Sequence, residues 1–360
     1  MSTAAQTTSA RSRVLTGDTP TGRLHLGHYV GSLENRLALQ DKYDCFFLLA
    51  NMHAFTTRAD KADDIRRDTI EIVKDWLAAG IDAAKSTIVL QTEVPAIAEL
   101  TWFFAMLLPF NRVMRNPTLK TEIETKDLGE TYSFGFPMYA VGQCADILAF
   151  RPVFVPVGED QVAHIEMCRE VARRFDQVYC GVNPKTEDRD YASSGGVFPI
   201  PEALVGRIGR LVGVDGKNKM SKSLGNAIFL SDAPKDVQKK VGKIFTGRQA
   251  PTEPGDVNNA LFQYVRAFIR DEARVKELED RYTRGDNLGD GHVKQEVAEW
   301  INKLLEPMRA RRAEFEKPGG DDAVIDIIRA GTKRANAVAE ETLFLAKQAM
   351  KLDFGRRTLG

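Results

Sequence analysis

Cysteine and histidine are scarce in this 360-residue chain, which holds four residues of the first kind and five of the second. The cysteines are Cys45, Cys144, Cys168 and Cys180, and no two of them form a C-x-x-C pair. Such wide spacing predicts no zinc or iron–sulfur site, and nothing else in the sequence indicates a metal site. We therefore expect reduced, mostly buried thiols in a cytoplasmic protein.

Net charge and long apolar runs are also absent. Lys plus Arg and Asp plus Glu both number 50, which gives no support to a general nucleic-acid binder, although one local basic face would be enough. No stretch approaches the roughly 18 uninterrupted apolar residues of a membrane span, so we expect no membrane partner. The first residues, MSTAAQTTSARSR, lack the apolar segment of a signal peptide. We expect a disordered tail over residues 1–12 and a flexible tail over residues 353–360.

Short apolar runs alternate with helical patterns over the first two-thirds of the chain. The strand-like runs are Arg13–Gly17, Asp44–Met52, Ser86–Thr92 and Val153–Gly158. The helical patterns are Tyr29–Tyr43, Ala62–Gly80, Ala96–Leu108, Gly135–Phe150 and Glu159–Phe175. This alternation predicts an α/β fold, with a doubly wound parallel sheet over residues 13–232 and a helical insertion at about 94–136. Over residues 233–352 the patterns are helical only, which predicts an all-α C-terminal domain.

Two polar, glycine-containing segments carry the residues best suited to chemistry. The first is TGDTPTGRLHLGH, Thr16–His28, where a strand ends and His25, Gly27 and His28 open the next helix. Ligands of doubly wound sheets bind at such strand ends, and histidines can donate to phosphate oxygens. Because G-x-G-x-x-G and G-x-x-x-x-G-K-[ST] are both absent, a nucleotide here would not be bound as in NAD or P-loop sites. A pair of core or capping histidines explains this segment equally well on its own.

The second segment is NKMSKSLGN, Asn218–Asn226, which places two lysines and two serines on a loop with almost nothing apolar. Gly216 and Gly225 flank the lysines, and a loop between glycines can move. Taken alone, this segment could be an ordinary solvated loop.

Together, the two segments resemble the signature motifs of class I aminoacyl-tRNA synthetases. HLGH, residues 25–28, resembles the first motif, and KMSKS, residues 219–223, matches the second letter for letter. Within that class the chain is most similar to the tryptophanyl-tRNA synthetases, over nearly its whole length. The similar blocks are TPTGRLHLGHYVGSL near the N-terminus, CADILAF (Cys144–Phe150), VPVGEDQVAHIEMCREVARRF (Val155–Phe175) and ANAVAEETL (Ala335–Leu343).

The resemblance implies a Rossmann-like catalytic domain followed by a helical domain that binds the anticodon. It implies activation of L-tryptophan by ATP, with Mg²⁺ as part of that substrate, then transfer to tRNA-Trp, without a tightly bound cofactor. It also implies a homodimer, whose interface would be the apolar helices after Val94. Lys219 and Lys222 would be the catalytic residues, because they would neutralise the ATP phosphates as pyrophosphate leaves the α-phosphorus.

The same resemblance assigns two sets of binding residues. The ATP set is Thr19, Pro20, Thr21, Gly27, His28, Gly158, Glu159, Asp160, Ile208, Lys219, Met220, Ser221, Lys222 and Ser223. The tryptophan set is Gly17, His53, Tyr139, Gln143, Asp146, Val155, Val157 and Gln161. Asp146 would accept the indole N–H, and a side chain without a donor would leave this buried carboxylate without a partner.

The chain departs from the commonest bacterial form at Thr19, where glutamine is frequent, and at Gln143, where methionine is common. Tyr139, Gln143 and Asp146 also have the Y-x-x-x-Q-x-x-D spacing with which tyrosyl-tRNA synthetases read a phenol. Three alternatives therefore remain: the same chemistry on tyrosine, a nucleotidyltransferase of the same fold that acts without tRNA, and a non-enzymatic synthetase-like paralogue. The long helical C-terminal region argues against the second, and the intact lysine motif argues against the third.

Overall fold

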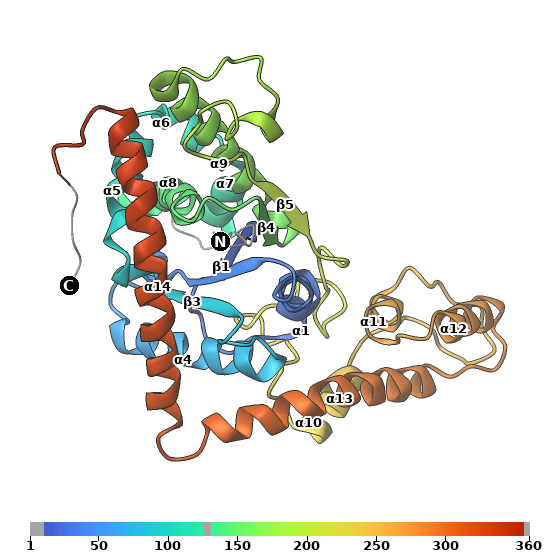
Figure 1. Ribbon diagram of the computed structural model, residues 1–360. Coiled ribbons are helices and arrows are strands. Elements are labelled where there is room, and N and C mark those ends of the chain that lie inside the picture. Colours follow the sequence, from blue (N-terminus) through green and yellow to red (C-terminus); the bar gives the residue numbers. More distant parts are fainter. Residues whose placement is uncertain (1–10, 126–130, 356–360) are drawn as a thin grey trace, which may run out of the picture.

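A five-stranded parallel sheet forms the centre of the computed structural model, which describes residues 11–125 and 131–355 (Figure 1). Its strands are β1 (Arg13–Asp18), β2 (Asp44–Leu49), β3 (Ser86–Leu90), β4 (Phe154–Val157) and β5 (Glu202–Val205). The spatial order is β3-β2-β1-β4-β5, and every pairing is parallel. The order reverses between β1 and β4, and doubly wound sheets bind ligands at the carboxyl ends of the strands beside such a reversal.

Helices cover both faces of the sheet and extend beyond it. Those that precede β5 are α1 (Leu26–His28), α2 (Glu34–Leu39), α3 (Asn51–Arg58), α4 (Ala62–Ala79), α5 (Pro95–Ala105), α6 (Phe110–Met114), α7 (Pro117–Thr125), α8 (Gly135–Leu148) and α9 (Val162–Phe175). Those that follow it are α10 (Pro234–Gly242), α11 (Ala260–Phe268), α12 (Glu272–Arg284), α13 (Asp290–Phe315) and α14 (Gly320–Ala349). The short 3₁₀ and π segments are η1 (Tyr29–Leu33), η2 (Gln91–Glu93), η3 (Glu159–Gln161), η4 (Asp176–Cys180) and η5 (Asp188–Asp190).

The predicted doubly wound parallel sheet is confirmed; β2, β3 and β4 lie within the predicted apolar runs, and β1 extends one residue beyond its run, to Asp18. β5 was not predicted, because its four residues are partly exposed and do not alternate between buried and exposed positions. The pattern at Tyr29–Tyr43, expected as one helix, is interrupted by the π turn η1. Gly206, directly after β5, lies so close to the carbonyl group of Gly31 that a Cβ atom there would clash. The π turn and β5 therefore fit together only with a glycine at this contact.

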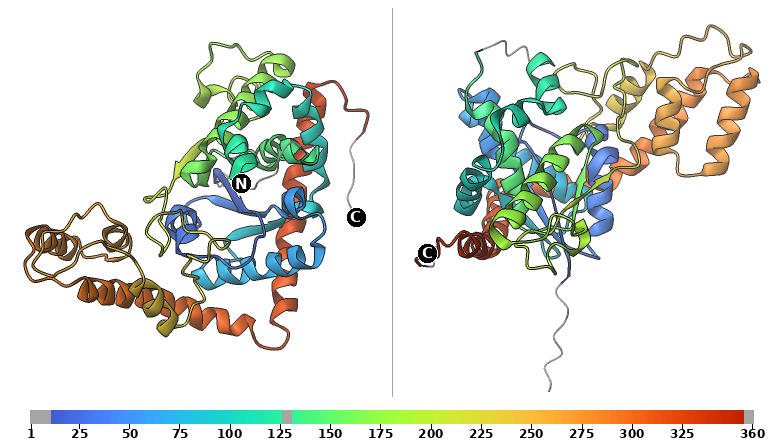
Figure 2. Two further views of the ribbon diagram at one scale, coloured as in Figure 1. Left: turned by 180° about the vertical axis from the view of Figure 1, so that it is seen from behind. Right: turned by 90° about the horizontal axis from the view of Figure 1, so that it is seen from above.

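Helix α14 lies along the edge of the sheet beside β3, and not with α10 to α13 (Figures 1 and 2). The backbone N–H of Leu90 on the edge strand donates to Thr332 Oγ1 at 3.0 Å. Gly331 approaches the backbone of Ile88 so closely that a Cβ atom would clash with its carbonyl oxygen. This corrects the expectation that all of residues 233–352 form one separate domain, because α14 covers an edge of the sheet that would otherwise expose unpaired backbone groups.

The other C-terminal helices form an extension beside the sheet. Helices α11 and α12 lie farthest from it, and the long helix α13 runs back to pack against α4 (Figure 1). Helix α10 packs against α13. Two apolar clusters lie on the two faces of the sheet: one joins Trp76 of α4 to Ile301 of α13, and the other joins Phe104 of α5 to Ala339 of α14. Both ends of the extension are thus fixed to the sheet by apolar packing.

Most residues of the predicted tails, 1–12 and 353–360, lie outside the described residues. The four cysteines are free thiols, and all except Cys180 are buried, as predicted. Within residues 11–125 and 131–355, no helix combines the length and the apolar character that a membrane crossing needs.

A buried ion cluster connects α13 to α4 and to the loop after β1. The Arg312 guanidinium of α13 is 4% exposed and bonds Glu71 and Asp75 of α4, together with Glu316 at 3.0 Å. Asp75 Oδ2 also accepts the backbone N–H of Leu24 at 2.6 Å. Burial raises the pKa of Asp75 to about 6, although Arg312 acts to lower it. Arg312 is therefore the cation that pairs with the buried Asp75, while Glu71 also pairs with Lys74 at 3.3 Å.

We expect Arg312→Met to lower the free energy of unfolding by about 3–5 kcal/mol, because buried carboxylates would lose their cation. Lys303→Met, at an exposed position of the same helix, is the matched control and should change it by at most about 0.5 kcal/mol. Urea unfolding followed by circular dichroism measures both values. Equal, small changes in the two variants would show that the cluster contributes little to stability.

Candidate active site

One continuous cavity of about 1030 Å³ opens where the sheet order reverses between β1 and β4. Gly17 and Asp18 at the end of β1 line it, as do Val157 and Gly158 at the end of β4. The loop of residues 219–223 lines it from the opposite side. Ligand cavities in proteins typically measure roughly 300–1,000 Å³, so this one is large enough for more than one small molecule.

Two histidines, with rings tilted by 39° to each other, stand at the start of α1. The ring centroids of His25 and His28 are 3.8 Å apart, and His28 Nδ1 accepts the backbone N–H of His25 at 3.2 Å. Burial lowers the pKa of His25 to about 2 and that of His28 to about 4, so both rings are neutral at pH 7. His25 Nδ1 is buried and has no hydrogen-bond partner among the described residues. A neutral ring carries one N–H, which suits it to donate to a phosphate oxygen.

Two lysines reach across the mouth of the cavity from the loop of residues 219–223. Lys222 Nζ donates to Thr21 Oγ1 at 2.9 Å and to the Gly22 carbonyl oxygen at 3.0 Å. Lys219 Nζ lies 3.1 Å from Asp160 Oδ1. Burial lowers the pKa of Lys222 from its ordinary value. A triphosphate entering the mouth could replace the neutral partners of Lys222 with charged oxygens, which gain more from an ammonium group.

The shape of this loop depends on its own polar contacts. Asn226 is buried, accepts the backbone N–H of Ser221 at 2.7 Å and donates to Asp215 at 3.0 Å. Gly216 and Gly225 have φ angles of 72° and 64°, in the left-handed region that favours glycine. The two glycines predicted to flank a movable loop therefore also permit its turns.

Asp18 and Arg36 form a charge-balanced wall beside the histidines. Arg36 donates to both carboxylate oxygens of Asp18, at 2.7 and 3.1 Å, and the Trp76 indole N–H donates to one of them at 2.9 Å. Burial acts to raise the pKa of Asp18, but the charge and hydrogen bonds of Arg36 outweigh it, so the pKa falls to about 2. Asp18 is therefore ionised at neutral pH, and Arg36 compensates its charge.

Asp146 lies at the other end of the cavity, on the buried face of α8. Its Oδ1 accepts a hydrogen bond from Gln91 Nε2 at 2.8 Å, and its Oδ2 lies 3.6 Å from His53 Nδ1. Burial raises the pKa of Asp146 to about 8, although the bond from Gln91 acts to lower it. Burial lowers the pKa of His53 to about 4, so the contact between His53 and Asp146 is not an ion pair at neutral pH. When Asp146 is ionised, its Oδ2 can therefore receive a donor from a ligand.

Amide and phenol groups line the space between the two ends. The Tyr139 hydroxyl lies 3.3 Å from His164 Nε2, and Gln143 Nε2 donates to Gln161 Oε1 at 3.4 Å. Strand β4 adds apolar side chains to the same lining. This end of the cavity can therefore hold an apolar group that carries one or two polar atoms.

Comparison with known proteins agrees with this geometry. The sequence model of a family described as tRNA synthetases class I (W and Y) matches residues 7–306. The chain belongs to this synthetase family. It is 43% identical over 345 residues to the tryptophan–tRNA ligase of Treponema pallidum, which covers 94% of this chain and 97% of that relative. A tryptophan–tRNA ligase of Streptococcus mutans is 41% identical over 351 residues, with 95% and 98% covered.

A solved structure supports the assignment of the chain to this family. The tryptophanyl-tRNA synthetase of Campylobacter jejuni, complexed with ADP and tryptophan, is similar to this synthetase with a TM-score of 0.76 and 31% sequence identity. The similarity covers 94% of this chain and 100% of the other. A tyrosyl-tRNA synthetase of Aeropyrum pernix, at 23% identity and a TM-score of 0.65, shares the fold.

The cavity of this synthetase brings together most of the residues predicted to bind substrates. All eight residues of the tryptophan set line it. From the ATP set it is lined by Thr19, Thr21, Gly27, His28, Gly158, Asp160, Lys219, Met220, Ser221, Lys222 and Ser223.

Three residues of the predicted ATP set do not line the cavity. The carbonyl oxygen of Pro20 is bound to Arg58 at 2.7 Å, the side chain of Glu159 is exposed, and Ile208 packs against the apolar core. Gly209, next to Ile208, lines the cavity in its place. Side-chain contacts from these three residues are therefore not supported, and a backbone contact near Ile208 stays a prediction.

Several polar residues of the site were not predicted, and four of them make the charged or buried contacts described above. Asp18, Arg36 and Arg58 line the cavity, and Gln91 holds Asp146 from behind. Asp18 could have been found from its place at the end of a predicted strand. Arg36 occupies a position in a helical pattern that resembles a surface charge, Arg58 lies outside every predicted element, and Gln91 stands near the end of an apolar run without any motif.

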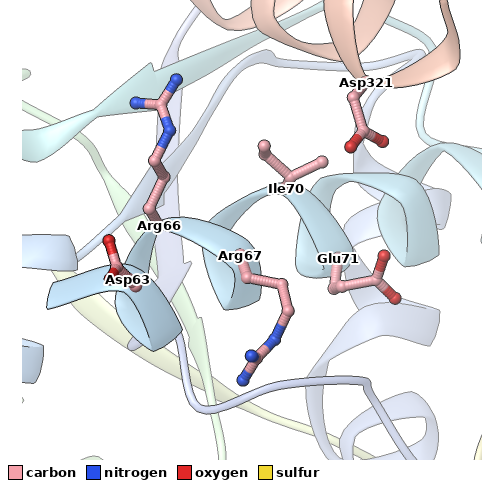
Figure 3. Close-up of a pocket in the computed structure, with 6 residues that line it drawn as sticks. All are labelled: Asp63, Arg66, Arg67, Ile70, Glu71 and Asp321. Carbon is pink, nitrogen blue, oxygen red and sulfur yellow. The ribbon is translucent and has the colours of Figure 1, made fainter. Parts of the chain in front are cut away.

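A second, smaller hollow of about 240 Å³ lies between α4 and the start of α14 (Figure 3). Its lining residues are Asp63, Arg66, Arg67, Ile70, Glu71 and Asp321. Neighbouring groups already pair several of these charges, as Arg67 with Asp64 at 2.7 Å and Asp321 with Lys74 at 2.6 Å. Because acids and bases are mixed and mutually paired, this hollow offers no excess charge to a substrate, and we assign the chemistry to the large cavity.

Proposed function

We propose that this synthetase activates L-tryptophan with MgATP and transfers the tryptophanyl group to tRNA-Trp. The observation that carries the proposal is a single cavity lined both by the buried Asp146 carboxyl and by Lys219 and Lys222. The relatives named tryptophan–tRNA ligase, at above 40% identity over almost the whole chain, support tryptophan as the amino acid.

The activation step needs little covalent chemistry from the protein. A carboxylate oxygen of tryptophan attacks the α-phosphorus of ATP, the bond from that phosphorus to the bridging oxygen breaks, and pyrophosphate leaves with the electron pair. The carboxylate is ionised at neutral pH, so no side chain has to remove a proton. The protein holds the reactants in line and neutralises the charge that develops on pyrophosphate. Lys219 and Lys222 would supply the positive charge, and His25 and His28 would supply neutral donors.

In the transfer step, a hydroxyl of the 3′-terminal ribose of tRNA attacks the carbonyl carbon of the adenylate, and AMP leaves. Mg²⁺ would enter with ATP, since it prefers oxygen ligands and is commonly bound through substrate phosphates. Within the described residues, no group of three or more His, Cys, Asp or Glu side chains is placed to hold a metal ion. Phosphate oxygens and water would therefore supply most of its ligands.

Amino-acid-dependent exchange of labelled pyrophosphate into ATP, measured in parallel with tryptophan and tyrosine, tests the proposal. We expect exchange with tryptophan and none with tyrosine, followed by charging of tRNA-Trp. Exchange with tyrosine alone would keep the mechanism and overturn the substrate. Exchange without charging of any tRNA would indicate a nucleotidyltransferase. A folded protein that binds ATP and shows no exchange would be a non-enzymatic paralogue.

We propose that the helical extension, residues 233–319, contacts the anticodon of tRNA in the cytoplasm. Lys235, Lys239 and Lys243 are exposed at four-residue intervals on and just after α10, so they share one face of the helix. Such a face can neutralise phosphates, although the chain as a whole carries no net charge. Because lysines that neutralise phosphates release counterions from tRNA, binding should weaken as salt rises.

A homodimer is expected through the apolar helices after Val94. Trp102, Met106 and Phe110 are large apolar residues on and after α5, and each is more than 60% exposed. Neighbouring exposed apolar side chains of this size often mark a protein interface. We expect light scattering to give a dimer for the unmodified chain and a monomer for Trp102→Asp with Met106→Asp. Phe354→Asp, at an exposed residue near the C-terminus, should remain dimeric, and a dimer of the double variant would place the interface elsewhere.

A further inference from the structure

Gln91, in η2 directly after β3, touches Asp146 from behind and is 1% exposed. Its Nε2 donates to Asp146 Oδ1 at 2.8 Å. Its Oε1 accepts the backbone N–H groups of Met52 at 3.0 Å and His53 at 3.4 Å, at the start of α3. Because two backbone donors face Oε1, the amide is held in one orientation, with Nε2 toward Asp146.

His53 completes this arrangement. Gln91 Nε2 lies 3.1 Å from His53 Nε2, so the second amide hydrogen has an acceptor when that ring nitrogen carries no proton. Neutral His53 then has its proton on Nδ1, which lies 3.6 Å from Asp146 Oδ2. This separation is longer than a hydrogen bond. Asp146 Oδ1 is thus occupied by Gln91, while Oδ2 stays available to a ligand.

We propose that Gln91 is a positioning residue that turns the Asp146 carboxylate so that its Oδ2 accepts the indole N–H of the substrate. The inference rests on the proposed activation of tryptophan. Without Gln91 the carboxylate would lose the donor on Oδ1 and could rotate away from the indole. The synthetase would then lose its selectivity for a substrate that carries the N–H, in addition to any loss of activity with all substrates.

Burial keeps three groups near Asp146 in one charge state between pH 6 and pH 9. His53 on α3 is neutral there, since burial lowers its pKa to about 4. Burial raises the pKa of Tyr139 on α8 and that of Cys168 on α9, so both stay protonated. Glu122 of α7 also lines the cavity and interacts with Tyr139. The pH dependence of kcat/KM for tryptophan should therefore report the titration of Asp146.

The direction of the pH dependence follows from which form of Asp146 the indole prefers. Burial raises the pKa of Asp146 to about 8, and the bond from Gln91 partly lowers it. An N–H donor binds the ionised carboxylate better than the neutral acid. The kcat/KM for tryptophan should therefore rise from pH 6 through a midpoint near pH 8 and level off near pH 9. Loss of the Gln91 donor removes the lowering contribution, so the midpoint should move to higher pH.

The test uses pyrophosphate exchange from pH 6 to pH 9, with tryptophan and with its analogue in which sulfur replaces the indole N–H. For Gln91→Met, kcat/KM should fall about 10- to 100-fold with tryptophan and less than about threefold with the analogue, because only tryptophan uses the positioned acceptor. The pH midpoint with tryptophan should move upward. Thr92→Val is the matched control, since it removes the adjacent, exposed bond of 2.8 Å between Asn51 and Thr92 that joins the same two segments. Thr92→Val should leave kcat/KM unchanged for both substrates, and it should leave the pH midpoint unchanged.

Gln91→Glu is the second variant, in case Gln91→Met folds poorly. It keeps an acceptor for the backbone N–H groups of Met52 and His53 and replaces the donor by a carboxyl. The midpoint should again move upward, because a neighbouring carboxyl disfavours ionisation of Asp146. Equal losses of kcat/KM with both substrates, or an unchanged pH midpoint, would overturn the positioning role of Gln91. Either result would leave the proposed function standing. No exchange by the unmodified synthetase with tryptophan would overturn the proposed function itself.

Discussion

Asp146→Asn should lower kcat/KM for tryptophan by about a thousandfold or more, because a site built around a hydrogen bond tolerates its loss poorly. Gln91 Nε2 would keep the asparagine oxygen at the position of Oδ1, 2.8 Å away in the present site. The amide nitrogen of the new side chain would then face the indole N–H, and two donors would oppose each other. Pyrophosphate exchange with varied tryptophan at saturating ATP measures this loss.

The KM for ATP provides the internal control, since Lys219 and Lys222 contact Asp160, Thr21 and Gly22 and not Asp146. It should change little in Asp146→Asn. A variant that retains selectivity for tryptophan over the sulfur analogue would show that the indole N–H is read elsewhere in the cavity.

The same substitution should stabilise the synthetase in the absence of substrate. Burial raises the pKa of Asp146 from 3.8 to about 8 in the folded state, so between these pH values the folded state holds a proton that the unfolded chain has released. Stability therefore falls as pH rises through this window. Asparagine carries a neutral amide that does not titrate in this window, so Asp146→Asn does not lose this stability. Its gain in melting temperature over the unmodified chain should therefore be larger at pH 8 than at pH 5. An equal gain at both pH values would contradict the raised pKa.

The parts of the fold that could be predicted are those set by local signals. Strands β1 to β3 are short apolar runs, because parallel strands are buried on both faces and need no alternation. The end of α4 was also predictable, because the glycine Gly80 ends the helix in the left-handed region, with a φ of 117°. Each of these features depends on a few consecutive residues, and that is the range over which a single sequence is informative.

The parts that could not be predicted depend on contacts between distant segments. Helix α14 has the pattern of any amphipathic helix, and only the edge of the sheet decides where it packs. Thr332 looks like a minor polar residue until Leu90, 242 residues away, is found to donate to it. The π turn η1 is likewise required by the close approach of Gly206 to Gly31, which no local pattern encodes.

The residues of the candidate site also divide into those that could be predicted from the sequence and those that could not. The histidines and lysines expected to contact phosphate stand in short motifs, and all four of them line the cavity. Gln91 and Arg36 act through a partner, and their importance follows from the burial of Asp146 and Asp18 at the ends of other elements. A residue whose role is to orient another carries no signature of its own in one sequence.

Lys222→Ala should lower kcat for pyrophosphate exchange about 100- to 1000-fold and leave the KM for tryptophan nearly unchanged. In the absence of ATP, Lys222 Nζ is held by Thr21 Oγ1 and the Gly22 carbonyl oxygen, at 2.9 and 3.0 Å. These are neutral acceptors, so the ammonium gains most when negative charge develops beside it. The interaction therefore strengthens as pyrophosphate leaves, and its loss should appear in kcat.

Lys217→Ala is the matched control for this prediction, because Lys217 is exposed on the same segment and does not line the cavity. It should change kcat by less than about twofold. A rise in the KM for ATP at constant kcat in Lys222→Ala would mean that Lys222 binds ATP equally in the ground state and the transition state. The lysine would then contribute affinity without catalysis, and the charge on the departing pyrophosphate would have to be neutralised by Lys219 and by the Mg²⁺ that accompanies ATP.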